Sequence, residues 1–121
     1  MQILIQHISD IRYVKDWSNM CYISGGSLRK IIQNKFNKSP KLVLREVRYE
    51  KIVFLIQKQG WDATSQFVAI ETGIGVTSDS LYKFLSRYYN TTFTQLRQQI
   101  LNEERRVKFV WLNGWTNLNE R

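Results

Sequence analysis

Two segments of the chain carry basic and polar residues at spacings that leave them on the free face of a helix. In the first, Arg29, Lys30 and Asn34 lie outside the apolar stripe of the helix expected over residues 26–36. Arginine can donate two hydrogen bonds to guanine, and asparagine can pair with the edge of adenine. The second segment, residues 64–89, has the same form: a short helix, a tight turn and another helix. Side chains of these types are suited to recognising DNA bases rather than to transforming a substrate.

Turn and cap residues predict where these helices begin and end. Ser24 is a good N-cap for the helix over residues 26–36, Gly73 supplies a turn, and residues 77–80 form a cap cluster. Helical spacing then predicts which side chains point inward. They are Ile11, Val14, Trp17, Ser18 and Cys21, then Leu28, Ile31, Ile32 and Phe36, and in the second segment Leu81, Phe84, Leu85 and Tyr88.

One amphipathic segment joins the two units. Ser39 is its expected cap, Pro40 suits the first turn of a helix, and Gly60 ends it. A helix over residues 40–58 spans about 27 Å at 1.5 Å per residue, which makes it a rigid spacer. Its expected inward residues are Leu44, Val47, Ile52, Leu55 and Ile56, and Arg45, Arg48 and Lys51 are expected to be available at its edges.

Composition favours an all-α fold and a polyanionic partner. The 121 residues include one Pro and six Gly, too few for the turns of a β-sandwich. The net charge is +8, and residues 1–60 carry 11 Lys or Arg against 4 Asp or Glu, whereas residues 61–121 carry 7 against 6. Such an excess is typical of proteins that bind nucleic acid, although a solvated basic surface without a partner has the same composition.

Catalytic and metal-binding patterns are weak. His7 is the sole histidine and Cys21 the sole cysteine, so no His or Cys pair stands at metal-ligand spacing. We therefore expect no enzyme activity and no cofactor. The N-terminus is too short and polar for a signal peptide, and no apolar run approaches the roughly 20 residues that cross a membrane. A reducing cytoplasm fits the single cysteine.

Over residues 5–100, these signals resemble the DNA-binding domain of the AraC/XylS family of bacterial transcription regulators. The second unit matches better, with Val68, Ala69, Gly73, Ile74, Ser80, Leu81, Leu85, Asn90 and Arg97 in the family's register; in the first unit and spacer the matches are Ser24, Leu28, Ile32, Asn37, Pro40, Leu44, Val47 and Arg48. The resemblance implies about seven helices. The expected division is residues 1–38 and 60–100 as two helix-turn-helix subdomains, 39–59 as the linking helix and 101–121 as a helical tail.

Several residues depart from the family pattern. Leu81 and Ile32 replace the usual Phe, and Ser18 replaces a buried Ala. Asn37 and Asn90 replace turn glycines. Asparagine tolerates the left-handed backbone conformation, so we expect both turns to be kept.

The family's register also implies which residues contact DNA, because the N-terminal half of each second helix meets base edges. These positions are Gly26, Arg29, Lys30 and Asn34 in the first unit, and Ser78, Asp79, Ser80, Tyr82 and Lys83 in the second. Lys38, Ser39, Lys41, Arg45, Arg87 and Arg97 would contact phosphate or be solvated. Asp79 is expected to cap its helix rather than to accept from cytosine.

Aromatic residues are expected mainly in the core. Trp17, Trp61 and Phe84 are assigned there rather than to base stacking. In the tail, Val107 and Trp111 share a helical face with Ile100. The tail is therefore expected to be a final helix packed on the second unit, and the alternative is an aromatic surface for RNA polymerase or another partner.

The expected function is a stand-alone, cytoplasmic, nucleoid-associated transcription regulator that binds double-stranded DNA as a monomer and reads two successive major grooves. The chain could equally be the DNA-binding part of a longer regulator. One alternative is an architectural or recombination accessory protein that bends DNA with the same grip. Another is a protein-interaction module that keeps the fold without binding DNA.

Overall fold

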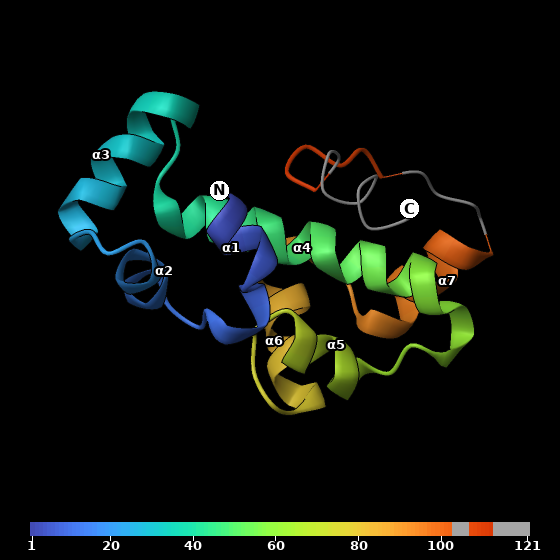
Figure 1. Ribbon diagram of the computed structural model, residues 1–121. Coiled ribbons are helices and arrows are strands. Elements are labelled where there is room, and N and C mark those ends of the chain that lie inside the picture. The colour runs from blue at the N-terminus through green and yellow to red at the C-terminus, as the bar shows by residue number, and fades with distance from the viewer. Residues whose placement is uncertain (103–106, 113–121) are drawn as a thin grey trace.

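The structure is a computed structural model that describes residues 1–102 and 107–112 (Figure 1). The described part of the chain is all-helical, with seven α-helices, two short 3-10 helices and no strand, which confirms the predicted all-α fold. The elements are α1 (Gln2–Gln6), η1 (Ile8–Asp10), α2 (Val14–Met20), α3 (Gly25–Phe36), α4 (Pro40–Gln59), η2 (Gly60–Asp62), α5 (Ser65–Glu71), α6 (Ser78–Tyr89) and α7 (Phe93–Leu101).

Helix α4 is the bar around which the other helices pack. In Figure 1 it crosses the molecule, with α2 and α3 at its N-terminal end and α5, α6 and α7 along the rest. The Ser39 hydroxyl accepts from the backbone N–H of Leu42 (3.2 Å), and Pro40 occupies the first turn, as predicted. Residues 52–56 are all buried, so this stretch is covered on every side. Buried residues of both units form one hydrophobic core with α4.

The two helix-turn-helix units, α2–α3 and α5–α6, are built with matched caps. Ser24 and Thr77 each accept a backbone N–H three residues on, at 3.1 and 3.3 Å. Each second helix runs for 12 residues and ends at an asparagine in the left-handed conformation, Asn37 (φ 56°) and Asn90 (φ 49°). The expectation that asparagine keeps these turns is therefore confirmed.

The turns between the paired helices also match. Tyr22 (φ 59°) and Gly73 (φ 71°) occupy the same place in their turns, both with left-handed backbone. The next residues, Ile23 and Ile74, each donate a backbone N–H to a carbonyl of the preceding helix at 3.1 Å. A Cβ on Gly73 would overlap the carbonyl oxygens of η1 and of Ile11, whereas the Tyr22 side chain projects into solvent. Glycine is therefore needed only in the second turn.

Three side chains predicted to be buried are exposed. Ile31 is 51% exposed because α3 packs only Leu28 and Ile32 fully against its neighbours. Trp61 is 53% exposed and lies beside the guanidinium of Arg97 (5.5 Å to the ring). Tyr88 was also predicted to point inward, but its ring lies at the surface under Arg45 (4.4 Å). Helical spacing alone does not show which faces receive a neighbour.

Residues 107–112 form no helix, so the predicted helical tail is wrong for this segment. They lie along α4, and Leu112 is buried in the common core. Residues 103–106 and 113–121 of the predicted tail lie outside the described residues. No helix in the described ranges combines the length and apolarity that crossing a membrane requires.

Candidate nucleic-acid interface

The free face of α3 carries the four residues predicted for the first unit. Gly26, Arg29, Lys30 and Asn34 are all exposed along this helix, which contains no Asp or Glu. No described residue forms an ion pair with Arg29 or Lys30. We call these four residues the α3 face. Within the part of the chain that the structure describes, nothing neutralises its two cations, which suits an anionic partner.

The free face of α6 is electrically different. Lys83 forms an ion pair with Asp79, one turn earlier in the helix (3.0 Å), and both side chains are exposed. Thr77 caps α6, so the predicted capping role of Asp79 is wrong; Asp79 instead neutralises Lys83. Tyr82 is exposed between them in sequence. An exposed pair of this kind contributes only about 0–1 kcal/mol to stability, so it can separate when a partner approaches.

The two serines of the α6 N-terminus are already engaged. Ser78 accepts from the hydroxyl of Ser65 (2.8 Å), which links α6 to α5. Ser80 shares the capping network, with its hydroxyl 3.2 Å from that of Thr77. We call Ser78, Asp79, Ser80, Tyr82 and Lys83 the α6 face. The hydroxyl groups in the first turn of α6 therefore mainly hold the start of this helix in place.

A basic groove opens between the two units. It has a volume of about 880 Å³ and lies where α2, the first half of α4 and the end of α6 meet. Its lining includes five cations and no carboxylate. They are Arg12, Lys15, Lys41, Arg45 and Arg48, with Ser39, Tyr13 and Tyr88 among the uncharged neighbours. This wall of positive charge suits a phosphate backbone.

The structure adds Arg12 and Lys15 to the candidate site. Both are exposed, Arg12 just before α2 and Lys15 in its first turn, in a segment where only the apolar stripe was predicted to matter. The run Arg12-Tyr13-Val14-Lys15 could have indicated this, because two cations flank an aromatic ring. The structure brings this run together with the predicted Lys41 and Arg45.

Arg48 braces the groove and is not a free edge residue as predicted. Its Nη2 donates to the carbonyls of Ile11 (2.8 Å), Arg12 (2.7 Å) and Gly73 (3.2 Å). It therefore ties the segment before α2 to the turn of the second unit. Burial, with nearby Arg12 adding to it, lowers the pKa of Arg48 to about 10, so the guanidinium remains charged at neutral pH.

Two other predicted phosphate contacts have structural partners. Arg97 donates from Nη1 to the carbonyl of Ala63 (3.0 Å) and is half-buried. Lys38 forms an ion pair with Glu46 (2.8 Å). By contrast, Lys41 and Arg87 are exposed, and the guanidinium of Arg87 lies over the Tyr88 ring at 5.3 Å.

The arrangement is chemically suited to binding a long polyanion. Two helix faces present side chains to solvent, and the basic groove lies between their units. In the described ranges no three His, Cys, Asp or Glu side chains come together as a metal site. Comparisons with protein-family models, with curated proteins and with solved structures find no match to this chain.

Proposed function

We propose that this protein is a sequence-specific regulator of transcription that binds double-stranded DNA as a monomer. Helices α3 and α6 enter successive major grooves, and the basic groove receives the phosphates between them. The observation that carries the proposal is the matched pair of helix-turn-helix units, α2–α3 and α5–α6, with the same caps and turn bonds. In a helix-turn-helix the second helix is the one that reads bases.

The distribution of charge supports the same partner. The cations of the α3 face and of the basic groove lie in the half of the chain that carries 11 Lys or Arg against 4 Asp or Glu. The resemblance of residues 5–100 to AraC/XylS DNA-binding domains agrees with this reading. Because the α3 face and the α6 face differ in sequence, the DNA site is asymmetric and binds one protein molecule.

The salt dependence of DNA binding tests the proposal. Neutralising about 5–8 phosphates gives a slope of log affinity against log salt of roughly −4 to −7. The measurement is fluorescence anisotropy with labelled duplexes selected from genomic fragments, over a range of potassium chloride concentrations. A slope shallower than about −2 would mean that the basic groove does not meet phosphate.

The position of the selected fragments separates the related functions. Sites beside promoters support the regulator. Sites confined to the ends of mobile elements would instead indicate an accessory protein of recombination that uses the same grip. Absence of any selected fragment, with the protein folded, would contradict DNA binding and leave a protein-interaction module.

A further inference from the structure

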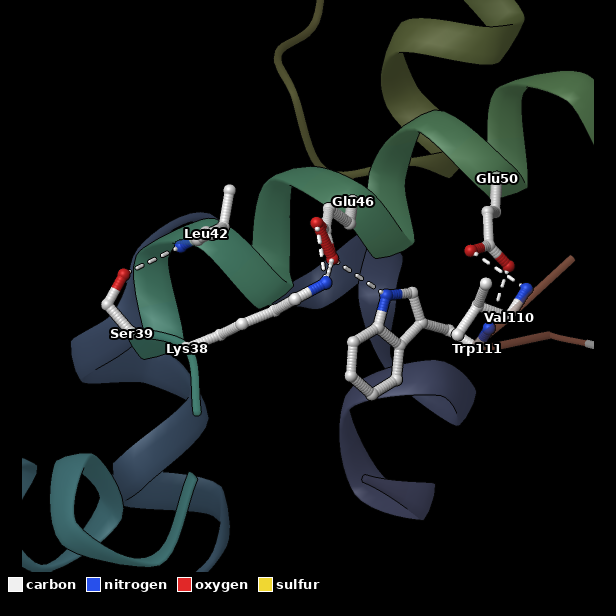
Figure 2. Close-up of polar contacts among 7 residues, drawn as sticks. All are labelled: Lys38, Ser39, Leu42, Glu46, Glu50, Val110 and Trp111. Carbon is white, nitrogen blue, oxygen red and sulfur yellow. Dashed lines mark hydrogen bonds and ion pairs between the residues drawn. The ribbon is translucent and has the colours of Figure 1, made fainter. Parts of the chain in front are cut away.

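Residues 107–112, which we call the strap, are fastened to α4 by a buried carboxylate. Glu50 is only 7% exposed. Its carboxylate accepts the backbone N–H groups of Val110 (3.2 Å), Trp111 (2.9 Å) and Leu112 (3.1 Å). Figure 2 shows Glu50 reaching from α4 to Val110 and Trp111. A buried carboxylate is costly unless it is hydrogen-bonded, and here the strap supplies the three donors.

Trp111 extends this attachment to the turn between α3 and α4. Its Nε1 donates to Glu46 (3.2 Å), and the same carboxylate binds Lys38 (2.8 Å), as Figure 2 shows. The Lys38 ammonium also lies 5.6 Å from the centre of the indole ring. Lys38 stands one residue after Asn37, where α3 ends. The strap thus holds the joint from which α3 projects.

The strap also contacts α3 directly. Phe36, the last residue of α3, meets the Trp111 ring edge-on, with centroids 4.8 Å apart and planes at 82°. Within α3 itself only Leu28 and Ile32 are buried. Phe36 and Trp111 therefore supply the contact that holds the far end of the helix.

In the second unit, the aromatic residue at the same position stacks on a ring of α4 itself. Tyr89 ends α6, twelve residues after its N-cap, just as Phe36 ends α3 twelve residues after Ser24. The Tyr89 ring stacks on Tyr49 of α4, with centroids 4.0 Å apart. Helix α4 offers a ring to α6, whereas the ring that meets the end of α3 comes from the strap.

From this difference we propose that the strap is the positioning element of the first unit: Trp111 and Glu50 set the orientation of α3 on α4, and so the fit of the α3 face to DNA. The DNA part of this inference rests on the proposed function. Neither residue contacts DNA; both act through Phe36 and the joint at Lys38. Losing the aromatic contact lets α3 pivot, so that the α3 face meets its groove less often in the right register.

The first measurement concerns the free protein and does not depend on DNA. Spin labels are placed in a Cys21→Ser background at exposed positions of α3 and α4 (Lys30→Cys with Gln57→Cys), and in a second protein at α4 and α6 (Gln57→Cys with Ser86→Cys). Pulsed electron spin resonance gives the distribution of distances. Trp111→Ala should broaden the α3–α4 distribution and leave the α4–α6 distribution unchanged.

The second measurement is affinity for a footprinted site. Trp111→Ala should weaken binding about fivefold to tenfold, the loss expected for one aromatic contact, and protection should fade first over the part of the site that the α3 face covers. Val110→Ala is the matched control, because its side chain is 66% exposed in the same strap. It should change neither the distances nor the affinity.

Glu50→Gln keeps one acceptor and tests the strap if Trp111→Ala does not fold. It should broaden the α3–α4 distribution as well. An unchanged α3–α4 distribution in a folded Trp111 or Glu50 variant would overturn the positioning role, whether or not DNA binds. If the distribution broadens but the unsubstituted protein binds no DNA, the proposed function fails and the strap's hold on α3 stands.

Discussion

The two helix-turn-helix units share one backbone plan but are held in place differently. Phe84 of α6 is 8% exposed, whereas Ile31, at the same distance from its N-cap, is 51% exposed in α3. Helix α6 therefore buries three side chains in the common core, whereas α3 buries two and is also held by the strap. Caps and turns specify the motif, and the contacts around it decide how firmly its second helix is fixed.

The charges on the two free faces follow the opposite order to how firmly the two helices are held. The less firmly held α3 face has unpaired cations among the described residues, while the firmly held α6 face has its lysine in an ion pair with Asp79. We therefore expect the α3 face to supply more of the binding free energy. The α6 face is expected to fix the register of the protein on DNA.

The largest effect is expected where the two turns differ. Gly73→Ala should destabilise the protein by about 3 kcal/mol or more, because the added Cβ meets the carbonyl oxygen of Ile11 at 2.7 Å and the backbone is left-handed. Tyr22→Gly, at the matching position of the exposed turn, should stabilise it by about 0.5–1 kcal/mol. Urea unfolding measures both. If both substitutions changed the free energy of unfolding by the same amount and in the same direction, the two turns would not be equivalent in backbone conformation.

The next comparison concerns the two free faces. The double variant Arg29→Ala with Lys30→Ala should weaken binding to one footprinted site by about 2–4 kcal/mol, since good base contacts are worth about 1–3 kcal/mol each. The double variant Tyr82→Ala with Lys83→Ala should cost less, because Lys83 is released from Asp79 before it can bind. Both are measured by anisotropy at one salt concentration, with circular dichroism to check the fold. If the second double variant lost more binding free energy than the first, the α6 face rather than the α3 face would supply more of the affinity.

The aromatic residues that end α3 and α6, Phe36 and Tyr89, should differ in how they respond to high pH. Desolvation raises the pKa of Tyr89 to about 12. An unfolded tyrosine ionises near pH 10, so the folded state holds its proton longer, and the stabilisation from Tyr89 is present below pH 10 and falls as the pH rises towards 12. After allowance for partial exposure, we expect a loss of about 1 kcal/mol.

This loss should be missing in Tyr89→Phe, which keeps the ring that stacks on Tyr49. The free energy of unfolding is measured at pH 9 and pH 11 for both proteins. Tyr22→Phe, at a ring that is 95% exposed, is the control and should behave like the unsubstituted protein. An equal loss in Tyr89→Phe would place the alkaline sensitivity elsewhere.

The smallest effect is expected at Asp79. Asp79→Asn removes a negative charge near phosphate and frees Lys83, so non-specific binding should strengthen about twofold at low salt and less at high salt. Thr77 remains as the helix cap, so stability should hardly change. Gel-shift titration with random-sequence duplex measures this effect. Loss of specific binding would indicate instead that Asp79 accepts a hydrogen bond from a base.

Local chemistry allowed much of the fold to be predicted from the sequence. Ser24, Ser39 and Asn37 act through their own backbone neighbours, so their roles follow from short patterns, and the linking helix was predicted to within one residue of its observed end at Gln59. Burial was harder to predict. The spacing of Ile31 fits an inward face, but whether another element covers that face depends on the tertiary arrangement.

The parts of the site that could not be predicted depend on partners distant in sequence. Arg48 looked like a free cation because its acceptors lie 25 to 37 residues away. Trp111 looked like a residue of a helical stripe, but Glu50, 61 residues before it, binds its backbone N–H and holds the strap along α4. Neither contact leaves a periodic signal. For the same reason Arg12 and Lys15 joined the basic groove only in the folded structure.

Hydroxyl-radical footprinting of the unsubstituted protein on one selected site, with sedimentation of the same complex, tests the central claim most directly. Two unequal readers on one rigid core should protect two windows about one helical turn apart, roughly 34 Å, with one protein molecule per duplex and stronger protection where the α3 face binds. A single window, or two protein molecules on a symmetric site, would contradict the account.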